Sequence, residues 1–297
     1  MMFVAERGFR LRPCPVGMGH ADCQHANQTA GQFPTRHLQS VGRFMQAFDH
    51  ITKGQRGTMP EIQDVTGTAF IVAEYRAREN AEQNPLYRDP IVQLFLSKRT
   101  RQAADRVAAN FPPGVQGVIL RTRYFEDRLD EQLSRGCRQV VIPGAGLDTR
   151  GVRKQKAGVT YFEIDDAEIL NFKKERLAKA GIEAQIVYIP GNYVTEGLLR
   201  LLAANGFNFD LPSYVIWEGN TMYLNRPEVL KVLTDLRKKV VKFAISFDYL
   251  TEAVINYATG DERSSTFAKH FAEMDAPWTF GIDDLGALAG DAGTNRR

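Results

Sequence analysis

The sequence is poor in cysteine, has no long apolar run and carries little excess charge, and each absence excludes a class of protein. Three cysteines in 297 residues do not make a disulfide framework, which favours a reducing compartment such as the cytoplasm. No apolar run approaches the ~20 residues that cross a bilayer, and the first residues lack the apolar core of a secretory signal. The net charge of +3, without clustered basic residues, argues against nucleic acid. We therefore expect a cytoplasmic protein with no membrane or nucleic-acid partner.

Residues 1–58 differ in composition from the rest of the chain. They are rich in glycine, glutamine and histidine and show no sustained periodicity, which is typical of a disordered or loosely packed extension. Four potential zinc ligands fall within them: Cys14, His20, Cys23 and His25. Their spacing does not match a Cys/His finger and no second ligand pair follows, so we predict no metal site.

Residues 59–137 have a helical pattern. Apolar side chains recur at helical spacing over 68–80, and a second amphipathic helix is predicted over 121–135, ending at Gly136. On this second helix Phe125, Leu129 and Leu133 stand at i, i+4 and i+8 and define its buried face. We interpret the region as a helical lid that carries the substrate region.

From residue 138 onward, short apolar strands alternate with helices. The predicted strands are 139–142, 159–164, 185–189, 213–217 and 240–247. Apolar strands separated by helices indicate a mostly parallel sheet covered on both faces. The sequence therefore predicts a doubly wound α/β domain over 138–297.

A glycine loop follows the first of these strands. Gly144-Ala145-Gly146 permits a sharp turn and a close approach of backbone to ligand. Asp165 lies 19 residues after Gly146, at the tip of the second strand, where a carboxylate accepts hydrogen bonds from the ribose of an adenosine cofactor. Together these features predict a nucleoside-containing cofactor.

Two cofactor classes share this geometry. A dinucleotide favours a third small residue at the sixth position of the glycine motif, where Thr149 stands, so an NAD(P)-dependent enzyme is the alternative rather than the first choice. S-adenosylmethionine (SAM) carries no phosphate but has a carboxylate, an ammonium and a sulfonium. Arg123, before the first strand, and Glu218, after the fourth, can bind the first two groups.

Several motifs together resemble the leucine carboxyl methyltransferase family, especially its bacterial branch of SAM-dependent methyltransferases. The matching segments are Thr68-Ala69 with Arg76 and Arg78, then 85–90, 121–127, 140–150, 162–165 and 217–224. The resemblance runs from about residue 66 to residue 285. It implies a class I methyltransferase fold, a Rossmann-like doubly wound sheet with an N-terminal helical lid, and SAM as the cofactor.

The resemblance also implies roles for individual residues. The expected cofactor contacts are Arg123 with the methionine carboxylate, Gly144, Ala145 and Gly146 beneath the methionine moiety, Asp165 with the ribose, Glu218 near the amino group, and Asn192 and Tyr193 beside the adenine. In the last block the family commonly has Asp-Leu, so the amide of Asn192 retains an acceptor but loses the charge.

The end of the chain departs from the family pattern. Residues 280–285 match a late segment, after which the family continues into a helix and two strands that this sequence lacks. We therefore expect a sheet without its last strands and an exposed edge. A non-catalytic protein with a degenerate fold is a further alternative.

The expected reaction is in-line transfer of the sulfonium methyl group to an oxygen of a small molecule or of a protein carboxylate. A carboxylate acceptor is already ionised at neutral pH, so catalysis would need positioning rather than a general base. A hydroxyl acceptor would need a base, and the sequence nominates none. The positioning candidates are Arg76, Arg78 and Tyr223.

Overall fold

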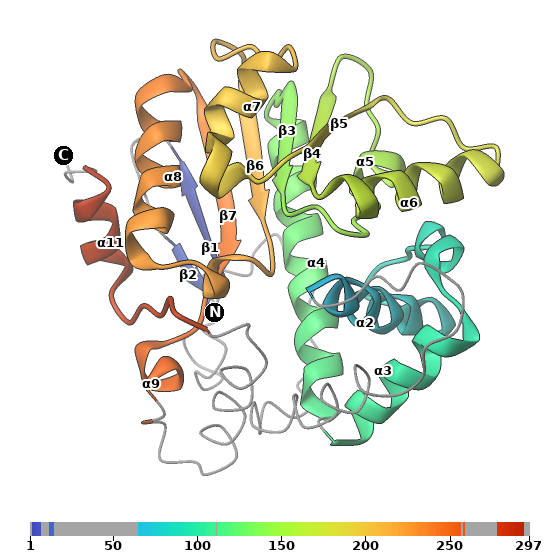
Figure 1. Cartoon of the computed structure of the whole chain (residues 1–297). Coiled ribbons are helices and arrows are strands. Elements are labelled where there is room, and N and C mark those ends of the chain that lie inside the picture. The colour runs from blue at the N-terminus through green and yellow to red at the C-terminus, as the bar shows by residue number, and fades with distance from the viewer. Residues whose placement is uncertain are drawn as a thin grey trace.

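The computed structural model describes residues 2–6, 12–14, 65–110, 112–256, 258 and 278–293. Its centre is a seven-stranded sheet of order β2-β1-β7-β6-β3-β4-β5 (Figure 1). Five of the strands are mutually parallel: β3 (Gln139–Pro143), β4 (Thr160–Asp165), β5 (Ile186–Pro190), β6 (Ser213–Trp217) and β7 (Phe243–Asp248). The predicted doubly wound parallel sheet is confirmed.

The strand order reverses beside β3, which pairs with β4 on one side and with β6 on the other. All five residues of β3 are buried, as expected for a central strand covered on both faces. In open α/β sheets such a reversal opens a crevice at the carboxyl ends of the strands, where ligands bind. The chain places its glycine loop at this point.

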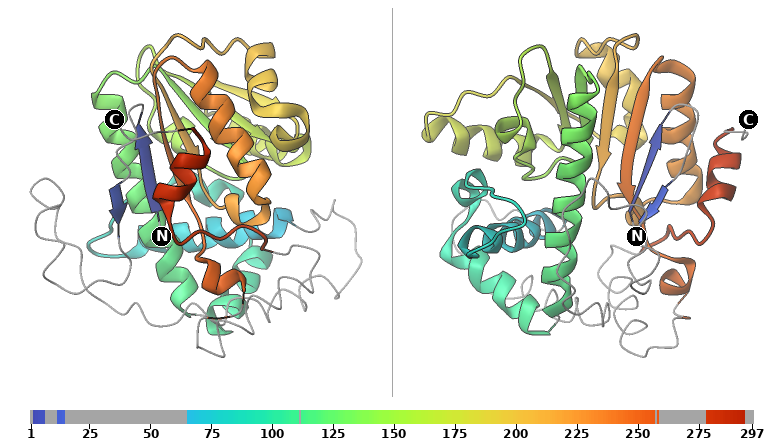
Figure 2. Two further views of the ribbon diagram at one scale, coloured as in Figure 1. Left: turned by 90° about the vertical axis from the view of Figure 1, so that its left-hand side faces the viewer. Right: turned by 180° about the vertical axis from the view of Figure 1, so that it is seen from behind.

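Helices cover both faces of the sheet (Figures 1 and 2). They are α4 (Pro112–Ser134), α5 (Arg150–Arg153), α6 (Ala167–Lys179), α7 (Leu198–Ala204), α8 (Arg226–Lys239) and α11 (Leu285–Asp291). The short helix α9 (Glu252–Ile255) lies below the sheet in Figure 1. Val141 of β3 packs in a cluster with α7, α8 and α11, whereas Val140 and Ile142 pack on the other face against α4. Alternate strand residues thus build two separate cores.

A helical layer lies below the ends of β3 and β4 in Figure 1. It comprises α2 (Val65–Arg78), α3 (Lys98–Asn110), the short helices η1 (Glu79–Ala81) and η2 (Ile91–Phe95), and the first half of α4. Its core includes Tyr75, Ala104 and Ile119, one from each of the three long helices. Within the described part of the chain, no helix is long and apolar enough to span a membrane.

Two strands near the N-terminus extend the sheet beyond β7. β1 (Met2–Glu6) pairs antiparallel with β7 over its whole length, and β2 (Arg12–Cys14) pairs with β1 (Figure 2). These residues cover the edge of β7. The expected loosely packed extension over 1–58 stays a prediction. The rest of 1–58, with His20, Cys23 and His25, lies outside the described residues.

Glu163 on β4 and Lys173 on α6 form a fully buried ion pair. Both side chains are 0% exposed, and Lys173 Nζ donates to Glu163 Oε2 at 2.5 Å. Burial raises the pKa of Glu163 to about 7, although the Lys173 ammonium opposes this rise. The pair fixes α6 against the strand that ends at Asp165.

The raised pKa gives a pH prediction for stability. Between the ordinary glutamate pKa of 4.5 and about 7, the folded protein retains a proton on Glu163 that the unfolded chain has released. The free energy of unfolding should therefore decrease as pH rises through this interval. Urea unfolding of the wild type and of Glu163→Gln across this range measures the effect, and the variant should have the flatter slope. Identical slopes would contradict this assignment.

Candidate cofactor site at the ends of the parallel strands

The glycine loop turns directly after β3. Gly144 and Gly146 have φ values of +64° and +47°, in the left-handed region that favours glycine. The loop is tied to β4, because the amide nitrogens of Gly144 and Ala145 both donate to the carbonyl oxygen of Ile164, at 2.8 and 3.1 Å. A Cβ on Gly144 would lie 2.1 Å from Oδ1 of Asn220, so this position also requires glycine because of close packing.

Asp165 connects the tip of β4 to the glycine loop. Its Oδ2 accepts from the amide nitrogen of Gly146 at 2.6 Å, and its Oδ1 accepts from that of Asp166 at 2.8 Å. Burial raises the pKa of Asp165, and these two hydrogen bonds offset only part of the rise. The neighbouring Asp166 stands at the N-cap of α6 without a side-chain capping bond.

Five charged side chains form an alternating line across the strand ends. In order they are Asp148, Arg150, Glu218, Arg121 and Asp248, and we call them the strand-tip charge line. The successive nitrogen–oxygen distances are 2.5, 2.8, 2.9 and 2.9 Å. The line joins the glycine loop, α5, the tip of β6, α4 and the tip of β7.

The two guanidinium groups stabilise the ionised carboxylates of the line. Burial alone would raise the pKa of Glu218, but Arg150 and Arg121 outweigh it and hold this pKa below its ordinary value. Burial is likewise outweighed at Asp148, chiefly by Arg150, and the pKa falls to about 2. The site thus contains two arginines among three carboxylates.

Arg123 lies away from this line. Its Nε donates to Asp127 at 2.9 Å and its Nη1 donates to the carbonyl of Leu86. Residues two apart on a helix are separated by about 200°, so Arg121 and Arg123 face nearly opposite directions. Arg121 reaches Glu218, whereas Arg123 contacts Asp127 and Leu86. The predicted cofactor contact of Arg123 stays a prediction.

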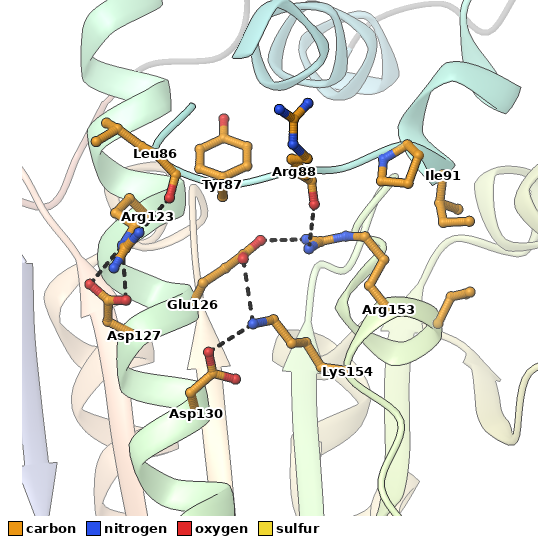
Figure 3. A pocket seen from close by; sticks show the side chains of 12 residues that line it. Leu86, Tyr87, Arg88, Ile91, Arg123, Glu126, Asp127, Asp130, Arg153 and Lys154 are labelled. Carbon is orange, nitrogen blue, oxygen red and sulfur yellow. Dashed lines mark hydrogen bonds and ion pairs between the residues drawn. The ribbon is translucent and has the colours of Figure 1, made fainter. Parts of the chain in front are cut away.

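Arg123 instead borders a cavity of about 570 Å³ beside α4 (Figure 3). The cavity lies between α4, residues 86–91 and the end of α5. Much of its charged lining is paired, since Glu126 contacts Arg153 and Lys154, and Lys154 contacts Asp130 at 2.7 Å.

Arg76 and Arg78 point to different surroundings. Arg76 Nη2 donates to the carbonyl of Leu147 at 2.8 Å and to Asp89 at 3.1 Å, so it lies against the glycine loop. Asp89 is fully buried and also accepts from Thr149 Oγ1 at 2.7 Å, which joins the helical layer to that loop. Arg78 pairs with Asp105 on α3 at 2.7 Å, within the helical layer.

The remaining predicted residues have structural contacts. Asn192 accepts from the amide nitrogens of Val194 and Thr195, as an N-cap of η3 (Tyr193–Gly197). Tyr193 is buried, and its hydroxyl accepts from Trp217 Nε1 at 3.0 Å. Tyr223, in η4 (Thr221–Tyr223), packs against the core of the helical layer.

Sequence reasoning missed Arg121, Asp148, Arg150 and Asp248 as members of the site. A signal for Arg121 was present, because it stands four residues before Phe125 and so shares the buried face of α4. Asp248 follows the same rule as Asp165, since each is the last residue of a parallel strand. Among the described residues, no group of three potential ligands could hold a metal ion.

The model of the leucine carboxyl methyltransferase family matches residues 69–237, more than half of the chain. The chain belongs to the leucine carboxyl methyltransferase family. The matched span contains the glycine loop, Asp165 and four members of the strand-tip charge line.

Two relatives carry the name "Putative S-adenosyl-L-methionine-dependent methyltransferase". The one from Frankia alni is 32% identical over 184 residues, covering 58% of this chain and 64% of the relative. The one from Mycobacterium tuberculosis is 33% identical over 177 residues, covering 54% of each. The chain thus spans less than two thirds of the length of these relatives. A crystal structure from Thermobifida fusca, described as a "putative methyltransferase", shares the fold, with a TM-score of 0.50 and 14% identity over 74% of this chain and 79% of that one.

Proposed function

We propose that this member of the leucine carboxyl methyltransferase family binds SAM at the ends of β3, β4 and β6 and transfers its methyl group to an oxygen acceptor. The observation that carries the proposal is the joint placement of the glycine loop, Asp165 and the strand-tip charge line at the reversal of strand order. Relatives named as SAM-dependent methyltransferases support the choice of cofactor.

The chemistry of these residues fits SAM. Glu218 and Asp248 provide acceptors for an ammonium group, and Arg121 provides a guanidinium for a carboxylate. Gly144 and Gly146 form a partly exposed turn beside them, and Asp165 provides the carboxylate for a ribose. We assign the methionine carboxylate to Arg121 rather than Arg123, and retain Asn192 and Tyr193 beside the adenine.

SAM supplies an activated methyl group, and the chain's task is to bind and orient the reactants. The acceptor we favour is a carboxylate of a small molecule or of a protein, because a carboxylate is already ionised at neutral pH. Arg76 is buried, pairs with Asp89 and donates to the carbonyl of Leu147, so its role is to hold the glycine loop in position. Burial raises the pKa of Tyr223, on which the nearby Arg121 and Asp248 also act, and this residue is a positioning candidate beside the charge line.

Calorimetric titration of the protein with SAM tests this proposal, and two arginines of α4 provide a matched comparison. We expect Asp165→Ala and Arg121→Gln each to weaken SAM binding about tenfold or more, since each removes a charged partner of the ligand. Arg123→Gln, the matched change two residues along the helix, should leave the affinity unaltered. The reverse pattern for the two arginines would restore the sequence-based assignment. A folded wild type that binds NAD(P) and not SAM would overturn the proposal.

A further inference from the structure

The strand-tip charge line begins and ends on a carboxylate, so its charges do not balance. Asp148 forms one end and Asp248 the other, with two guanidiniums shared among three carboxylates. The side chains of Asp148, Glu218 and Asp248 are 7%, 11% and 8% exposed, so solvent screens this excess weakly. The line therefore holds one net negative charge beside the glycine loop.

The neighbouring charges leave this excess in place. Arg76 belongs to a second alternating line with Asp89, Arg153, Glu126, Lys154 and Asp130, which contains three charges of each sign. Lys173 is paired with Glu163 in the core. Asp165, beside Gly146, adds a further carboxylate rather than a cation.

Asp248 is one of the two terminal carboxylates that give the line its excess. Without it, Asp148 and Glu218 would balance the two arginines. Its Oδ2 accepts from Arg121 Nη1 at 2.9 Å and its Oδ1 accepts from the amide nitrogen of Gly219 at 2.7 Å. Glu218 is separately held, with one oxygen on Arg150 and the other on Arg121, so its position does not depend on Asp248 alone.

The strand-tip charge line is adjacent to the glycine loop. Asn220 Nδ2 donates to the carbonyl of Glu218 at 2.7 Å and to that of Gly144 at 3.4 Å. A ligand seated on the glycine loop therefore lies beside the tip of β6. The charge of that ligand therefore interacts electrostatically with the charge line, and solvent screens this interaction weakly.

We propose that this excess charge makes the site prefer SAM over its demethylated product, S-adenosylhomocysteine, and that Asp248 sets the preference. The inference rests on the proposed function. In the transfer, an acceptor oxygen lone pair forms the new carbon–oxygen bond, while the sulfur–methyl bond breaks and its electron pair stays on sulfur. The sulfonium becomes a neutral thioether, so the ligand changes from a net charge of +1 to zero. The cationic form compensates the excess, and the product leaves it uncompensated.

Calorimetric dissociation constants of the two ligands test this inference. For Asp248→Asn we expect the ratio of the S-adenosylhomocysteine constant to the SAM constant to fall about three- to tenfold, as one nearby charge is lost. Arg121→Gln changes the charge in the opposite sense. It should raise that ratio, although it weakens both ligands because both carry the methionine carboxylate. Asp210→Asn, an exposed site before the start of β6, provides a matched control that should leave the ratio unchanged.

The outcomes separate this inference from the function on which it rests. Equal weakening of both ligands by Asp248→Asn, or an unchanged ratio in Arg121→Gln, would overturn the role of the excess charge while SAM binding stands. A wild type that binds neither ligand would overturn both proposals. If Asp248→Asn fails to fold, as thermal unfolding would reveal, the opposite shift in Arg121→Gln decides the question.

Discussion

Replacing Lys173 with methionine should destabilise the fold by about 3–5 kcal/mol, because it leaves a buried carboxylate without its partner. Lys173 and Glu163 are both 0% exposed, and Glu163 Oε1 has no hydrogen-bond partner. Urea unfolding at neutral pH measures the loss. Without the Lys173 ammonium the pKa of Glu163 should rise further, so the loss should grow as pH rises above about 7 and level off below it.

Two controls distinguish loss of the charge pair from a general effect of the substitution. Lys179→Met makes the same change on the same helix, at an exposed pair with Glu175, and should alter stability little. The double variant Lys173→Met/Glu163→Leu removes both buried charges and should recover most of the loss. A double variant as unstable as Lys173→Met would show that packing, and not the unpaired carboxylate, causes the effect.

The parts of the site that the sequence predicts are those set by local pattern. Apolar runs locate the strands, and the glycine loop and Asp165 follow them directly, so their meeting at the strand ends follows from a parallel sheet. Arg121 is different, because its placement depends on the rotational phase of α4. The phase defined by Phe125 and Leu129 would have indicated it, but motif similarity draws attention equally to Arg123.

Other features depend on contacts between distant segments, which no local pattern encodes. Met2 lies opposite Asp248 in the sheet, although the two are separated by nearly the whole chain. Arg121 joins Glu218 and Asp248 from a helix about a hundred residues earlier. Such pairings depend on which strands pair at the edge of the sheet and on how the helices pack against it. The charge line therefore cannot be predicted from local sequence patterns.

Gly144→Ala should weaken SAM binding about tenfold or more while preserving the fold. The new Cβ would lie 2.1 Å from Asn220 Oδ1, and the φ of +64° also disfavours an L side chain. Relief requires either a shift of the glycine loop or displacement of the Asn220 amide, which donates to the carbonyl of Glu218. Either change disturbs the alignment of the loop with the charge line, and calorimetry with SAM measures the result.

Gly146→Ala provides the comparison within the same loop. Its Cβ would meet only Ala69 Cβ at 3.4 Å, an ordinary contact, so the backbone conformation is the main cost and we expect the smaller loss. Asn220→Ala in the Gly144→Ala background should restore part of the affinity, because it removes the group with which the new methyl collides. Equal losses of SAM affinity at both glycines, with no recovery in the Asn220→Ala background, would show that backbone conformation causes the effect and not the packing of Gly144 against Asn220.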